Sequence, residues 1–245
     1  MGAPRLLARP GAMESTLKGD SRPVPSFTYA YLSGIRVFHF HDTSSDAPVM
    51  SSEPKENSVG LAGDARNLAP FLLYLRDNQP ATYDHIKDTI RLIAPFFADF
   101  VLVPDTAGRV TLRWRQVGLP EDTFGPAAFS DGTLRFVCLA TLLNQPGEFL
   151  PKLILLDEPE LGLHPHAIQI LAELLKSAGA RTQLIIATQS PYLVDQFAPD
   201  SVIVVERQDN ASILKRLQNQ EWEAWLEQYR LGDIWRMNLL GGTPL

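Results

Sequence analysis

The pattern of apolar and polar residues changes near residue 66, and regular elements are predicted from there onward. Apolar side chains then recur every three or four residues, a spacing typical of a helix, at Leu68, Phe71, Leu72 and Leu75. A second helix is predicted over 82–97, after a break at Pro80. Alternating residues over 100–103 and 110–116 predict a β-hairpin. Residues 66–128 are therefore expected to form a helical pair and a hairpin.

The region 129–245 alternates between helical and strand patterns. The predicted order is a helix over 132–144, a strand over 153–156, a helix over 166–178, and strands over 183–188 and 201–206. Short strands that are apolar throughout indicate a largely parallel sheet covered on both faces, which is an α/β core. The aromatic-rich tail over 221–242 is predicted to be helical, and either packs on this core or forms a partner surface.

The first 65 residues give a weaker pattern. Prolines and a Ser/Asp/Glu-rich stretch over 43–58 predict poor organisation for 1–65. Only residues 27–40 are expected to be ordered, and their periodicity does not decide between a strand and a helix end.

Composition excludes several classes of protein. In a chain of 245 residues, 45% hydrophobic content is too high for disorder, and no apolar run approaches the roughly 18 residues of a membrane helix. The single Cys138 excludes an internal disulfide framework, and no secretory pattern opens the chain, so a cytoplasmic location without membrane contact is expected. A net charge of −6 argues against a strongly basic nucleic-acid module.

The strongest chemical signal is a pair of acids, Asp157 and Glu158, directly after the apolar run 153–156. Open α/β sheets place their ligands at the carboxyl ends of strands. One carboxylate there can hold Mg²⁺ through water, and its neighbour can deprotonate an attacking water. The alternative is that both acids only favour the start of the next helix.

Two further segments carry candidate chemistry. Ser130 is a natural N-cap for the helix after it, and Gly132 in the first turn leaves N–H groups free for an anion. Without other evidence, this is only a capped helix. Thr188 and Gln189 follow another buried strand, so Gln189 is expected to face the same crevice as Glu158.

Together these segments resemble the carboxyl-terminal half of ABC-type ATPases of the SMC/RecF-like group, which includes prokaryotic AAA family and predicted ATPases. Residues 130–135 are similar to the signature motif, 153–158 to Walker B with the catalytic glutamate, 160–164 to the D-loop, and 188–191 to the switch-histidine loop. The resemblance covers about 67–245 and implies a P-loop NTPase core with a largely parallel sheet.

The resemblance also implies roles for individual residues. Asp157 would hold Mg²⁺ through water, Glu158 would activate the attacking water, and Gln189 would sense the γ-phosphate of ATP. The nucleotide-binding set would comprise Ser130, Asp131, Gly132, Arg135 and His164. Arg135 could instead pair with a local acid, and His164 could simply start a helix. Such ATPases work as head-to-tail dimers coupled to DNA or to an effector protein, in DNA repair or phage defence.

Two departures from the family pattern alter this expectation. Gln189 stands where relatives carry histidine, so no group there titrates near neutrality. In addition, no lysine follows a glycine, as a GxxxxGK[ST] phosphate loop requires: the lysines are Lys18, Lys55, Lys87, Lys152, Lys176 and Lys215. The chain is therefore expected to begin after the phosphate loop and the first strands of the sheet.

Two alternative functions follow. The chain could be a truncated or split, non-catalytic interaction module that needs a partner chain bearing the Walker A loop. It could also be a metal-dependent hydrolase that uses His39 and His41 on alternate residues of a strand, although no other cluster of ligands completes such a site.

Overall fold

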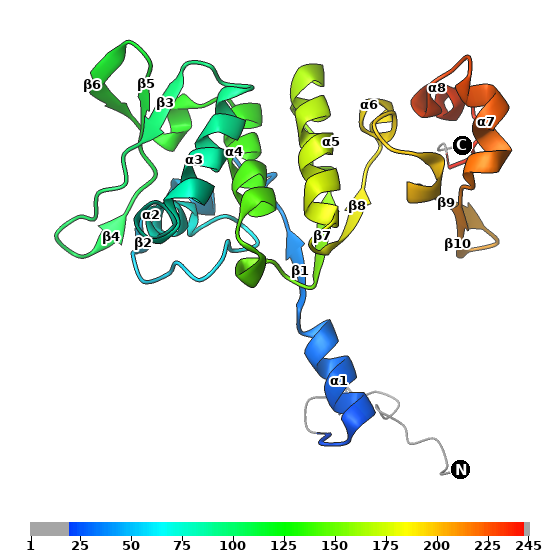
Figure 1. Cartoon of the computed structure of the whole chain (residues 1–245), viewed down its shortest axis with the longest axis horizontal. Coiled ribbons are helices and arrows are strands. Elements are labelled where there is room, and N and C mark those ends of the chain that lie inside the picture. Colours follow the sequence, from blue (N-terminus) through cyan, green and yellow to red (C-terminus); the bar gives the residue numbers. More distant parts are fainter. Residues whose placement is uncertain (1–19, 243–245) are drawn as a thin grey trace.

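A three-stranded parallel sheet forms the centre of the computed structural model, which describes residues 20–242 (Figure 1). Strand β7 (Leu153–Asp157) lies between β1 (Ile35–Phe38) and β8 (Gln183–Ala187). In the register, Leu155 pairs with Val37 on one side and with Ile185 on the other. This confirms the predicted α/β class with a parallel sheet.

The other helices and strands of the described residues are as follows. The helices are α1 (Pro23–Leu32), α2 (Leu68–Asn78), α3 (Pro80–Arg91), α4 (Asp131–Asn144), α5 (Pro165–Gly179), α6 (Pro191–Val194), α7 (Asn219–Leu226) and α8 (Leu231–Arg236). The other strands are β2 (Glu53–Pro54), β3 (Phe97–Phe100), β4 (Arg109–Val110), β5 (Trp114–Gln116), β6 (Leu119–Phe124), β9 (Ile203–Gln208) and β10 (Ala211–Arg216). Short 3₁₀ turns span Pro48–Met50, Pro126–Ala128, Gly147–Phe149 and Pro199–Ser201.

One continuous hydrophobic core joins the sheet to helices α2 to α5. Helix α4 is buried along almost its whole length and packs against α3 and α5. The α2–α3 pair confirms the predicted helical pair, although α3 ends at Arg91, and Phe97 belongs to β3. The predicted hairpin is replaced by a sheet in which β5 pairs antiparallel with both β3 and β6, while β4 pairs with β2.

The segment 35–65 differs from the sequence prediction of poor organisation. Part of it forms β1, and its buried side chains join the main core, among them Ala47, Val49, Leu61 and Ala65. Their irregular spacing gives no periodic signal, because they pack from loops and from the 3₁₀ turn Pro48–Met50 rather than from a longer helix or strand. The predicted region 1–65 also includes residues 1–19, which lie outside the described part of the chain.

The carboxyl-terminal part of the chain has a small core of its own. Strands β9 and β10 pair antiparallel as a separate hairpin, so the predicted strand over 201–206 does not join the parallel sheet. Trp222, Leu231 and Ile234 are buried together beside this hairpin. Trp225 and Tyr229 stay exposed, so only part of the aromatic tail packs as predicted.

No helix within residues 20–242 is long and apolar enough to cross a membrane.

The sheet predicts a contrast between two isoleucines. Ile154 of β7 is fully buried, whereas Ile185 of β8 is 50% exposed. Ile154→Ala should lower the free energy of unfolding by about 2–5 kcal/mol, because it leaves a cavity between packed layers. Ile185→Ala should cost roughly 1 kcal/mol or less, because little of its side chain is removed from water. Urea unfolding followed by circular dichroism measures both, and equal losses would contradict this burial pattern.

Candidate functional site

The carboxyl ends of the three parallel strands meet at one edge of the sheet. Asp157 ends β7 and pairs in register with Ala187, the last residue of β8. The backbone N–H of Glu158 donates to the carbonyl of Ala187 at 2.8 Å, which holds the loop after β7 against the start of the loop after β8. Thr188 and Gln189 follow directly. The backbone segments that carry Glu158 and Gln189 are therefore adjacent.

Glu158 has an unusual backbone conformation. Its φ is +39°, in the left-handed region that residues with a Cβ rarely adopt. Such strain costs on the order of 1–3 kcal/mol and persists where the surroundings enforce it, often at functional sites. Here the chain must turn sharply after a buried strand, and the turn leaves the Glu158 side chain half-buried beside the exposed carboxylate of Asp157.

Glu160 is a site residue that sequence analysis did not single out. It is buried, and its Oε1 accepts a hydrogen bond from the Thr188 hydroxyl, while Oε2 is buried without a partner among the described residues. Burial raises the pKa of Glu160, and the nearby carboxylates of Glu158 and Asp157 raise it further, against the opposing hydrogen bond from Thr188. An acid inside the otherwise apolar turn 159–163 was the signal that could have revealed it.

Ser130 caps α4 as predicted. Its Oγ accepts from the backbone N–H of Thr133 at 3.2 Å. Asp131 is exposed in the first turn. The first backbone N–H groups of a helix have no intrahelical acceptor, so this end of the 14-residue helix α4 can receive an anion.

Gly132 brings the start of α4 against the turn after β7. A Cβ at Gly132 would lie 2.4 Å from the carbonyl oxygen of Gly162, which itself has a φ of +79°. This approach is possible only for glycine. The signature-like segment and the D-loop-like turn are thus in direct backbone contact within one chain.

Arg135 makes contacts within the chain that the sequence did not predict. Its guanidinium is buried and donates to three backbone carbonyls: Nε to Phe40 at 3.0 Å, Nη2 to His41 at 2.8 Å, and Nη1 to Leu161. None of these hydrogen bonds goes to an acidic side chain of the described residues. Arg135 is therefore a positioning residue that ties α4 to the end of β1 and to the turn after β7.

The histidines also have local partners. His164 caps α5, its Nδ1 accepting from the backbone N–H of His166 at 3.3 Å. His41 Nε2 lies 2.7 Å from the carbonyl oxygen of Asp157, and since a carbonyl only accepts, Nε2 carries the proton. Residues 20–242 contain no group of three His, Cys, Asp or Glu side chains able to hold a metal, so a metal-dependent hydrolase based on His39 and His41 has no ligand set.

The donor atoms at the sheet edge suit magnesium bound together with phosphate. Mg²⁺ prefers oxygen ligands and usually binds one or two carboxylates while keeping several waters. Asp157 offers an exposed carboxylate, and the carboxylate of Glu158 is half-buried beside it. The set is too small for an all-protein cage but fits an ion that takes its remaining ligands from substrate and water.

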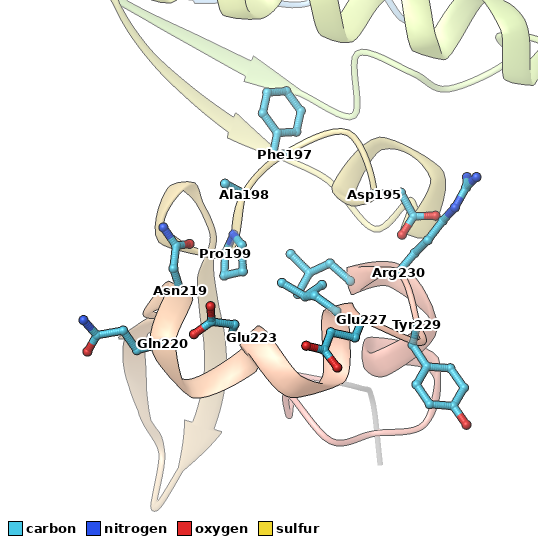
Figure 2. A pocket seen from close by; sticks show the side chains of 12 residues that line it. Asp195, Phe197, Ala198, Pro199, Asn219, Gln220, Glu223, Glu227, Tyr229 and Arg230 are labelled. Atoms are coloured by element: carbon cyan, nitrogen blue, oxygen red, sulfur yellow. The ribbon is translucent and has the colours of Figure 1, made fainter.

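An open cavity of about 840 Å³ lies away from this edge, between residues 195–199 and helices α7 and α8 (Figure 2). Its walls carry the carboxylates of Asp195, Glu223 and Glu227, with Arg230 as the only lining cation. Three acids against one base repel a polyphosphate. This cavity is therefore not the candidate nucleotide site.

Comparisons with known proteins agree with the geometry. The family model described as "AAA domain, putative AbiEii toxin, Type IV TA system" matches residues 31–195, more than half of the chain. A Methanosarcina acetivorans protein named "Putative ABC transporter ATP-binding protein" is 35% identical over 82 residues, which cover 33% of this chain and 28% of that protein's length.

Two solved Smc head domains have a similar fold. The Pyrococcus furiosus Smc head with an extended coiled coil, bound to the C-terminal domain of ScpA, matches with a TM-score of 0.50 and 17% identity, over 64% of this chain and 39% of that one. A second Smc head, bound to the C-winged helix domain of ScpA, matches with a TM-score of 0.54 and 15% identity, over 77% and 57%.

The contact between Gly132 and Gly162 predicts a sensitive position. Gly132→Ala should lower the free energy of unfolding by about 1–3 kcal/mol, because the added Cβ must push the Gly162 carbonyl away. Gly147→Ala is the matched control, since a Cβ there meets nothing within 4 Å. Thermal unfolding of the two variants gives the comparison, and equal stability would contradict the close approach.

Glu160 predicts a pH dependence of stability. Because its pKa is raised from the ordinary 4.5 in the folded protein, the folded state holds this proton more tightly than the unfolded state. Its stability contribution is complete below pH 4.5 and is lost as pH rises through the folded pKa. Glu160→Gln should therefore flatten this fall in the free energy of unfolding above pH 4.5. The control is Glu173→Gln, an exposed residue paired with Lys176, which should keep the wild-type slope.

Proposed function

This chain belongs to the family described as "AAA domain, putative AbiEii toxin, Type IV TA system", and we propose that it supplies the acidic half of an ATP-hydrolysing site. Its family and fold are those of an ABC/SMC-like ATPase nucleotide-binding domain. One observation carries the proposal: Asp157 and Glu158 meet the Thr188-Gln189 loop where adjacent parallel strands end. Because the chain spans only part of its relatives' length, whole-protein activity belongs to this proposal.

The proposed reaction converts ATP and water to ADP and phosphate. Mg²⁺, when bound, neutralises charge on the phosphate oxygens, and Asp157 holds it through water. Glu158 accepts a proton from the attacking water as its oxygen bonds to the γ-phosphorus, and the bond to the ADP oxygen breaks. Gln189 donates a hydrogen bond to the γ-phosphate but cannot carry a proton at neutral pH.

In this proposal the amino-terminal end of α4 of a second subunit completes the site. Ser130, Asp131 and Gly132 lie at an exposed helix start whose free N–H groups suit a γ-phosphate. Arg135 and His164 act within their own chain, as a clamp and a helix cap. A head-to-tail dimer closing on ATP would then drive a change in bound DNA or in an effector protein, in repair or phage defence.

A second candidate function has its own supporting observation. The 245 residues contain no GxxxxGK[ST] sequence, so the backbone donors and lysine that hold the β- and γ-phosphates are not supplied by this sequence. The chain would then be a non-catalytic module that contributes an interface to a subunit bearing the phosphate loop.

Two variants separate binding from catalysis. We expect Asp157→Ala to weaken Mg·ATP binding by the full chain about tenfold or more, because the ion loses its carboxylate. Glu158→Gln should retain binding and lower turnover by about 10²–10⁴-fold, because the amide cannot take the proton. Calorimetry measures binding, and released phosphate measures turnover.

Glu148→Gln, an acid on the 147–149 turn, serves as the control and should behave as wild type. Wild-type turnover in Glu158→Gln would reject Glu158 as the base. Complete absence of Mg·ATP binding by the wild-type chain would favour the non-catalytic module.

A further inference from the structure

Helix α6 links the loop that carries Gln189 to the carboxyl-terminal part of the chain. Gln189 is exposed, and only Ser190 separates it from α6, which begins at Pro191. Leu193 of α6 packs in the main core, whereas Val194 packs in the small carboxyl-terminal core. Figure 1 shows α6 between α5 and α8, and α6 contacts both of these helices. The position of this short helix is therefore set by the two cores together.

Both neighbours of Gln189 are anchored. The Thr188 hydroxyl donates to Glu160 and accepts from the backbone N–H of Ser190 at 3.0 Å. The Ser190 hydroxyl accepts from the backbone N–H of Leu193 at 3.3 Å and so caps α6. The direction in which the exposed Gln189 side chain leaves the backbone consequently depends on where α6 lies.

The first turn of α8 holds α6 in place. The backbone N–H of Gly232 lies in that turn without an intrahelical acceptor, and it donates to Oδ1 of Asp195 at 2.6 Å. A Cβ at Gly232 would lie 2.5 Å from the Pro191 carbonyl oxygen, so only glycine allows this approach. Pro191 begins α6 and Asp195 directly follows it, so α8 contacts both ends of the helix. Figure 2 shows Asp195 beside Arg230, the residue that precedes α8.

A second contact joins the same two helices. The Arg236 guanidinium of α8 lies over the Tyr192 ring of α6, 5.8 Å from its centroid. Both side chains are exposed, so water weakens this cation–π contact. Gly232 is buried, and its close backbone approach is therefore the stronger constraint on α6.

We propose that Asp195 and Gly232 are positioning residues for Gln189. Through α6 they hold the backbone on which Gln189 stands, so α8 sets the direction in which this amide meets a ligand at the sheet edge. The segment that contains α8 is itself tied to β9, because Gly242 donates its N–H to Glu206 at 3.1 Å. The placement of Gln189 rests on these contacts alone, whereas its consequence for ATP hydrolysis rests on the proposed function.

Hydrogen exchange of the full chain, measured by mass spectrometry over 186–194, tests this placement. Asp195→Ala removes the acceptor without adding volume and should speed exchange in this segment about tenfold, because the amide hydrogen bonds of α6 open more often. Asp195→Asn keeps an oxygen acceptor for the Gly232 N–H and should exchange as the wild type does. Gly232→Ala should match Asp195→Ala, and the Asp195 pair decides alone if Gly232→Ala does not fold. Wild-type exchange in Asp195→Ala would overturn the proposal.

Gly241→Ala is the matched control for general loosening of the small core. A Cβ at Gly241 would clash with the Glu206 carboxylate, so this variant disturbs the same terminal segment where it meets β9 rather than α6. It should speed exchange over β9 and leave 186–194 unchanged. Equal speeding of 186–194 by Gly241→Ala and Gly232→Ala would mean that the loop responds only to loss of the small core, and would overturn the proposal.

Released phosphate distinguishes this inference from the proposed function. Asp195→Ala should lower kcat about tenfold with little change in the KM for Mg·ATP, and Asp195→Asn should keep the wild-type values. Faster exchange with unchanged kcat would support the positioning and reject the role of Gln189 in the proposed function. A wild-type chain without turnover would reject the proposed function, and hydrogen exchange would still decide the positioning. Turnover that depends on Glu158, with exchange over 186–194 alike in all variants, would support the proposed function and overturn the positioning.

Discussion

The parallel pairing of β7 with β1 and β8 is the constraint on which the candidate site depends. In a parallel sheet all strands end at the same edge, so residues far apart in sequence are delivered to one place. Here the register fixes Asp157 opposite Ala187, and the backbone bond from Glu158 to Ala187 extends the alignment one residue beyond the strands. A shift of one residue would turn the alternating side chains of β8 to the opposite faces.

The packing of helix α4 against the sheet edge holds the loops that follow β1 and β7 in place. The buried helix α4 rests against the turn after β7 through Gly132, and it reaches the end of β1 through Arg135. The helix that would present N–H groups to a phosphate is thereby linked to the turn that bears the acids. Any movement of α4 must also move this turn, which is a physical route for coupling the two halves of such a site.

The sequence predicted those parts of the protein in which a periodic apolar pattern is followed or preceded by characteristic polar residues. The apolar run 153–156 predicted the central strand, which ends at the candidate site, and the Ser130 cap was visible from its residue type. The position of β1 in the sheet was not predictable, because four residues flanked by a helix and a loop give no clear period. Glu160 was not singled out, and the main-chain contacts of Arg135 were not predicted. Both depend on buried contacts with residues 26 to 95 positions away in the sequence.

The Arg135 clamp has a consequence for how this fold tolerates change. All three of its acceptors are main-chain carbonyls, which every amino acid provides. Positions 40, 41 and 161 can therefore change their side chains without loss of the clamp, provided that the backbone keeps its path. The arginine has no such freedom, since a lysine ammonium carries one nitrogen and cannot span three divergent oxygens in a plane. The clamp therefore depends on the identity of one residue only, Arg135.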